Sequence, residues 1–96
     1  MRRAARIDAN QDAIVSALRA AGASVQSLAA VGQGVPDLVV GIRGEDFFLE
    51  CKDGAKRPSA RALTPDQRKW IDAWRGRPVV VVNSPDEALR AVGVLR

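Results

Sequence analysis

The 96-residue sequence is 47% hydrophobic and 27% charged, which is enough for one compact domain and too little for two. Its 15 basic and 11 acidic residues give a formal charge of +4, which suits a polyanionic partner without requiring one. Because the chain has no histidine and no tyrosine, we exclude histidine-dependent nucleases, Ser-His-Asp hydrolases, typical zinc sites and tyrosine recombinases. Among common phosphodiesterase chemistries, the kind based on a metal and carboxylates remains.

The cysteine content and the hydropathy pattern bear on the cellular compartment. The single Cys51 cannot form an internal disulfide, and no apolar run approaches the ~20 residues that span a bilayer. We also expect no signal peptide ahead of the fold. The protein is therefore predicted to be cytoplasmic, with no membrane partner.

A first helix is predicted from Ile7, after a short basic lead over residues 1–6. The lead is interpreted as a solvated terminus or, alternatively, as an arm that reaches phosphates. Apolar residues then recur every three or four positions until Gly22 ends the pattern. Gln11 lies on the stripe that should face a sheet, and it also fits a capping box with Asp8.

A short strand is predicted over residues 25–28, followed by a loop in which two glycines flank Gln33. Gly32 and Gly34 allow backbone conformations closed to other residues and a close approach of a phosphate. An ordinary connecting loop is the alternative interpretation.

Two apolar runs, residues 38–42 and 47–49, flank a cluster of turn formers at residues 43–46. This pattern predicts a β-hairpin with an even-numbered loop, formed either by Gly44-Glu45 or by the whole cluster.

The predicted hairpin brings three charged side chains together. With that loop, Asp37 lies opposite Lys52, and Val39 lies opposite Glu50. Because side chains alternate along a strand and paired residues share a face, Asp37, Glu50 and Lys52 should project on one side of the sheet.

Two carboxylates and a lysine on a covered face are costly unless they are paired or used. They suit the hydrolysis of a phosphodiester with a hard divalent cation, Mg²⁺ or Mn²⁺. Asp37, Glu50 and the backbone carbonyl of Cys51 are the predicted metal ligands. Lys52 would orient the attacking water or offset charge in the transition state. A mere salt bridge in a structural partner protein is an alternative.

These residues match a known motif. Pro36-Asp37, followed after a spacer by Glu50-Cys51-Lys52, resembles the PD-(D/E)xK nuclease superfamily, and within it the VRR-NUC group of small nucleases, which are similar to Holliday junction resolvases. The resemblance covers most of the chain and implies a single VRR-NUC-like domain over residues 1–96. It implies an α/β fold with a restriction-endonuclease-like core, a mixed β-sheet flanked by helices in the order α-β-β-β-α-β-α. It also implies a phage or bacterial setting.

The resemblance further implies supporting catalytic residues. Relatives often carry a glutamate on the first helix, where this sequence has Gln11, and a glutamine at the start of the helix after the motif, where it has Gln67. A glycine-rich stretch also precedes the PD motif in the family, which favours nucleic-acid contact by Gln33 and Gly34. The missing acid at Gln11 puts tight binding of a second metal in doubt.

Residues 53–63 are predicted to be a loop, because they are polar and punctuated by glycine and proline. The loop leaves the end of the strand that bears the site. Lys56, Arg57 and Arg61 are therefore candidates for contact with backbone phosphates, and an ordinary solvated face is the alternative.

A helix is predicted to begin at Thr64, with Gln67 completing a capping box, and to end near Arg75. Trp70 and Trp74 share the face of Gln67, so we interpret them as core against the sheet. A base-stacking role for either tryptophan is the alternative.

The continuous β-branched run of residues 79–82 predicts a strand that is buried on both faces and lies parallel to the strand of Glu50. Ser84 should then cap a last helix that carries Leu89 and Val92 on its inner face.

The sequence thus predicts a metal-dependent DNA endonuclease that hydrolyses phosphodiester bonds. Since no recognition helix or added domain is evident, branched DNA such as a Holliday junction is the predicted substrate, and symmetrical cutting of it favours a homodimer. A non-catalytic nucleic-acid-binding module that retains the fold is the alternative, supported by Gln11 in place of an acid.

Overall fold

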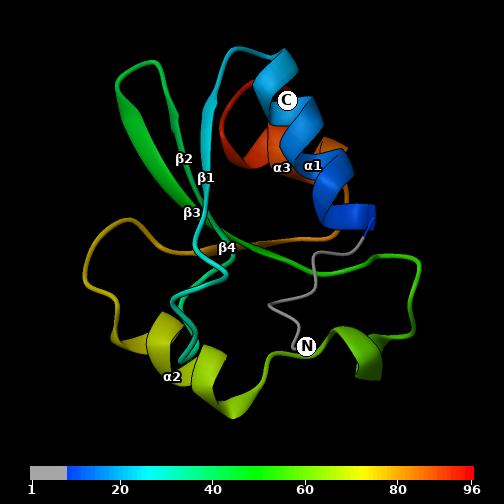
Figure 1. Ribbon diagram of the computed structural model, residues 1–96, viewed down its shortest axis with the longest axis vertical. Coiled ribbons are helices and arrows are strands. Elements are labelled where there is room, and N and C mark those ends of the chain that lie inside the picture. The colour runs from blue at the N-terminus through cyan, green and yellow to red at the C-terminus, as the bar shows by residue number, and fades with distance from the viewer. Residues whose placement is uncertain (1–8) are drawn as a thin grey trace.

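The computed structural model describes residues 9–96 and shows a four-stranded mixed sheet with helices on both faces (Figure 1). The strands lie in the order β1-β2-β3-β4. A 3₁₀ turn, Pro58–Arg61, precedes α2, and the helices and strands are α1 (Ala9–Ala20), β1 (Ser24–Ser27), β2 (Leu38–Ile42), β3 (Glu45–Cys51), α2 (Pro65–Ala73), β4 (Val80–Val82) and α3 (Pro85–Ala91). The predicted order and the mixed α/β fold class are confirmed.

The hydrophobic core lies on the face of the sheet that α1 and α3 cover. Alternate residues of β2 and β3, among them Leu38, Val40 and Leu49, are fully buried there. They pack with Ile14 and Leu18 of α1, which are also fully buried. The other face, which carries Glu50, is therefore not part of this core.

The apolar stripe of α1 is confirmed, because Gln11 is buried together with the two core residues of that helix. The predicted helix start at Ile7, the basic lead of residues 1–6 and the Asp8 capping box lie outside the described residues. Within residues 9–96, no helix is long and apolar enough to cross a membrane.

The hairpin of β2 and β3 is confirmed, but its predicted register is wrong by two residues. Ile42 pairs with Glu45, so only Arg43 and Gly44 form the turn, with φ angles of 51° and 78°. Two central residues with positive φ are typical of a type I′ turn, which matches the twist of the flanking strands. The Arg43 guanidinium donates to the carbonyl of Val92 (2.9 Å) and so anchors the turn to the end of α3.

The register determines which residues lie opposite one another. Val39 pairs with Phe48 and not with Glu50, and the predicted pairing of Asp37 with Lys52 is wrong for the same reason. A shift of two residues preserves the alternation of side chains, so Asp37 and Glu50 still share a face.

The face with Glu50 is covered only in part, by the short helix α2. The tryptophans were predicted to be core against the sheet. They do lie against the sheet, but their burial as core is wrong: Trp74 is 41% exposed, Trp70 is half-buried and α2 has no fully buried residue. Trp70 and Trp74 instead stack on each other and meet Phe48 of β3 edge to face. The helix also ends at Ala73, before the predicted Arg75.

β4 pairs in parallel with β3, as predicted. The prediction that this strand is buried on both faces is wrong: Val82 is 1% exposed, whereas Val81 is 36% exposed. β4 is an edge strand, and only its core face is covered by α1 and α3. Ser84 caps α3 as predicted, since its hydroxyl accepts from the N–H of Glu87.

Candidate active site

The structure gathers the two predicted carboxylates where β2 begins and β3 ends. Asp37 immediately precedes β2, and its Oδ2 accepts a hydrogen bond from the backbone N–H of Cys51 (2.7 Å). This bond holds the Asp37 carboxylate against the end of β3, next to Glu50. The Glu50 side chain is only 2% exposed.

Lys52 follows the last residue of β3 and completes the predicted cluster. Its backbone N–H donates to the carbonyl of Val82 (2.9 Å), which extends the ladder between β3 and β4 by one bond. Its Nζ lies 3.6 Å from Glu50 Oε2, an ion pair in which the lysine side chain is 14% exposed.

Gln67 of α2 joins the other two residues. Its Nε2 donates to Glu50 Oε2 (2.9 Å), and its Oε1 accepts from Lys52 Nζ (2.9 Å). The same Oε1 accepts from the backbone N–H of Thr64, and the Gln67 N–H donates to the Thr64 hydroxyl, which completes the predicted capping box. One side chain therefore starts α2 and orients the site, so the two interpretations of Gln67 are compatible.

Burial makes Glu50 hard to ionise. The pKa of Glu50 is raised from 4.5 to about 8: desolvation is the largest cause and the neighbouring Asp37 carboxyl is the second, while Lys52 acts in the opposite direction. The ionised form of the Glu50 carboxyl is therefore unfavourable in the protein alone, and added positive charge beside it would stabilise that form.

The site fits a hard divalent cation. Glu50 Oε1 is buried and has no hydrogen-bond partner, and the second carboxylate lies beside it. Within residues 9–96, no group of three or more His, Cys, Asp or Glu side chains is placed to hold a metal ion. Two carboxylates, completed by water, phosphate and backbone oxygens, are nevertheless the usual donor set for Mg²⁺. The carbonyl of Cys51 remains a predicted ligand.

The loop before Asp37 packs against the start of α2. Gly34 has φ +84°, and a Cβ there would overlap the backbone carbonyl of Asp66, so this position requires glycine. Gly34 thus packs against the helix that carries Gln67. Gln33, by contrast, has an exposed side chain, with φ 59°.

The predicted basic loop continues directly from Lys52. It contains the 3₁₀ turn Pro58–Arg61, in which the Arg61 Nε donates to the carbonyl of Lys56 (2.8 Å). Lys56 and Arg57 are exposed. The loop therefore presents positive charge at the end of the sheet that bears the carboxylates.

Sequence reasoning missed Asn10. Its Nδ2 donates to the carbonyls of Lys52 (2.6 Å) and Asn83 (3.3 Å), which ties the start of α1 to the ends of β3 and β4. The only signal was an amide side chain next to Gln11 on the predicted first helix. Gln11 itself is buried on α1, the helix that packs on the opposite face of the sheet from Glu50.

Comparison with known proteins gives one informative finding. No family model and no curated protein matches the chain. The chain is similar to a solved structure described as a VRR_NUC domain, with 30% sequence identity and a TM-score of 0.64 over 85% of this chain and 88% of that one. The similarity therefore covers most of both chains.

Proposed function

Because the chain belongs to the VRR-NUC family, we propose that it is a metal-dependent DNA endonuclease in which Asp37 and Glu50 hold Mg²⁺ or Mn²⁺. The observation that carries this proposal is the buried Glu50 Oε1, which has no hydrogen-bond partner and lies beside a second carboxylate. A buried polar atom of this kind calls for a ligand.

The cation, when bound, supplies positive charge beside the scissile phosphate and lowers the pKa of a water molecule. Asp37 and Glu50 bind it, with the Cys51 carbonyl as a further ligand. Lys52 orients the attacking water or offsets the charge that develops on the phosphate.

Two glutamines support these groups. Gln67 fixes the side chains of both Glu50 and Lys52 through its 2.9 Å hydrogen bonds, so that neither has to reorganise during the reaction. Gln11, although α1 packs on the opposite face of the sheet from Glu50, is proposed to support the site through the start of α1, where the neighbouring Asn10 donates to the carbonyl of Lys52 (2.6 Å), and it brings no charge.

DNA is bound through its backbone. Lys56, Arg57 and Arg61 contact phosphates beside the cut, and the loop of Gln33 and Gly34 contacts the strand from the other side. The enzyme is proposed to select DNA structure and not sequence, and a branched junction is the proposed substrate. A homodimer cuts it symmetrically, in the cytoplasm.

A non-catalytic DNA-binding module is the second candidate. It is favoured by Gln11, a neutral side chain buried where relatives often carry a glutamate. In such a module the charges of Asp37, Glu50 and Lys52 would only hold the hairpin end against α2.

The test is cleavage of a labelled four-way junction, a flap, a matched duplex and single-stranded DNA in Mg²⁺, Mn²⁺ and EDTA. Wild type should cut only with metal, and Lys52→Ala and Asp37→Asn should each lose cleavage at least 100-fold while retaining DNA binding, measured by anisotropy. Absence of cutting on every substrate, with salt-sensitive binding intact, would leave the binding module.

A further inference from the structure

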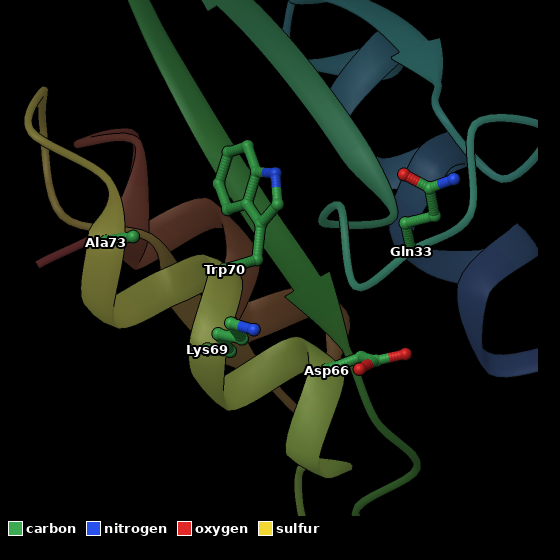
Figure 2. A pocket seen from close by; sticks show the side chains of 5 residues that line it. All are labelled: Gln33, Asp66, Lys69, Trp70 and Ala73. Carbon is green, nitrogen blue, oxygen red and sulfur yellow. The ribbon is translucent and has the colours of Figure 1, made fainter.

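A pocket of about 410 Å³ lies between α2 and the loop of Gln33 and Gly34, beside the candidate active site (Figure 2). Of its lining, the mechanism above uses only Gln33. Pockets that bind small ligands have ~300–1,000 Å³, so this one has room for a planar ring with part of a sugar. The residues that line it are Gln33, Asp66, Lys69, Trp70 and Ala73.

Trp70 gives the pocket an aromatic surface that is already held in place. Trp74 stacks on one face of its indole, with 4.7 Å between centroids and 13° between planes, and Phe48 meets it edge to face at 5.7 Å. Trp70 is nevertheless only half-buried, and it is one of the residues that line the pocket. A fixed indole with a free surface is a stacking platform for a base.

The polar groups of the pocket suit the edge of a base. In Figure 2 Asp66 points from α2 toward the side of the Gln33 loop, so a carboxylate and an amide border the same space. The carboxylate repels a phosphate but accepts from the amino groups of adenine, cytosine or guanine. Thymine has no such amino group. Lys69, which also lines the pocket, offers a positive charge to the phosphate of the nucleotide whose base enters it.

The pocket and the candidate active site share one helix. Asp66 immediately precedes Gln67, and Trp70 lies three residues further along α2, a rise of ~4.5 Å. Gly34 packs against Asp66 and Gln67, so the loop of Gln33 and Gly34 lies against the start of α2, where Gln67 orients Glu50. A strand whose phosphate lies at Asp37 and Glu50 therefore places a neighbouring nucleotide within reach of Trp70.

We propose that this pocket receives one unpaired nucleobase of the DNA strand being cut, stacked on Trp70 and held at its edge by Asp66 and Gln33. The placement next to the cut rests on the proposed function. The substrate class is then DNA with an unpaired nucleotide beside the scissile phosphate. A base that carries an amino group should bind better than thymine.

The test is the fluorescence of a single 2-aminopurine placed at successive unpaired positions of a flap and of a four-way junction, measured in EDTA with Lys52→Ala protein so that no cleavage occurs. At one position, binding should quench the probe by stacking. Trp70→Leu should abolish this quench and weaken binding about tenfold. Trp74→Phe is the matched control, because it changes the other indole of the same cluster, outside the pocket lining, and keeps an aromatic ring against Trp70.

Two further variants separate a loss of fold from a loss of the pocket. Ala73→Leu fills the pocket while preserving a good helix former, and should also remove the quench. Gln33→Gly removes the amide at a position whose positive φ glycine adopts freely, and should reduce the preference for amino-bearing bases over thymine.

The outcomes distinguish this inference from the proposed function. Equal quenching in the Trp70→Leu and Trp74→Phe proteins, or none in the parent protein at any position while anisotropy reports binding, would overturn the pocket. If wild type cuts DNA with metal in either of those cases, the nuclease proposal stands alone. If a quench depends on Trp70 but no substrate is cut, the pocket stands and the nuclease proposal fails. Absence of DNA binding would overturn both.

Discussion

Gln67 of α2 donates a 2.9 Å hydrogen bond to Glu50 of β3 and thereby couples the start of a helix to a buried carboxylate. The bond matters because α2 has no fully buried residue to fix its position on the sheet. The amide of Gln67 therefore helps to position α2 as well as the site.

The Gln67→Glu substitution separates these two roles. Glutamate at this position still completes the capping box with Thr64, so α2 should begin normally. It cannot donate to Glu50, and it adds a negative charge beside a carboxyl whose pKa is already raised. We expect cleavage to fall about 10–100-fold.

Thr64→Ala is the converse control. It removes the hydroxyl of the cap and should cost about 1 kcal/mol of unfolding free energy with little loss of cleavage. If Gln67→Glu cleaves like wild type, the amide does not orient the site.

Gly34 and Gly32 provide a matched pair of substitutions. Both have positive φ, 84° and 71°, so alanine costs each about 1–2 kcal/mol. Only at Gly34 would the new Cβ overlap the backbone of Asp66, whereas at Gly32 nothing lies within 4 Å. Gly34→Ala should therefore lose a further ~1–3 kcal/mol in urea unfolding and lose cleavage, because α2 must shift. Equal losses in the two proteins would show that the loop does not position α2.

The raised pKa of Glu50 predicts how the stability of the metal-free protein depends on pH. Between pH 4.5, the ordinary pKa of the group, and about 8, the folded state binds more protons than the unfolded state. The free energy of unfolding should therefore fall as the pH rises through this range, by a few kcal/mol at most. Urea unfolding at a series of pH values in EDTA measures it.

Glu50→Gln is the control for this dependence. The amide has no charge to desolvate, and it can still accept from Gln67 and donate to Asp37. Its stability should change much less between pH 4.5 and 8, and it should exceed that of wild type at pH 8. Parallel pH curves for the two proteins would show that Glu50 is not the titrating group.

The hairpin shows what the sequence could and could not predict. Alternation predicted that Asp37, Glu50 and Lys52 share a face, and that result does not depend on a register shift of two. The register depends on a positive φ at Arg43, uncommon for arginine, and Arg43 is anchored by the carbonyl of Val92, distant in the sequence. No local pattern reveals that contact.

The exposure of Trp74 and Val81 could not be predicted either. The spacing of apolar residues identifies the face of a helix or strand that points to the sheet, but not whether another element covers it. Here α2 is only nine residues long and β4 is an edge strand, so both residues stay partly exposed. Capping motifs such as Ser84 were predicted correctly because they are local.

The basic loop should appear in the salt dependence of DNA binding. Lys56→Ala and Arg57→Ala should each lower the slope of log K against log salt by about 0.9 on duplex if they contact phosphates. Arg77→Ala is the control, because Arg77 pairs with Glu45 at the other end of β3, about 20 Å from Lys52. Unchanged slopes in the loop variants would identify the loop as a solvated face.

Titration with Mn²⁺ by calorimetry, in two buffers of different ionisation enthalpy, tests most directly that Asp37 and Glu50 form a cation site. Wild type should bind Mn²⁺ near pH 7 and release a proton, since the pKa of Glu50 is about 8. Asp37→Asn and Glu50→Gln should each weaken binding at least tenfold, and Thr64→Ala should not. Unchanged Mn²⁺ affinity in both carboxylate variants would contradict the account.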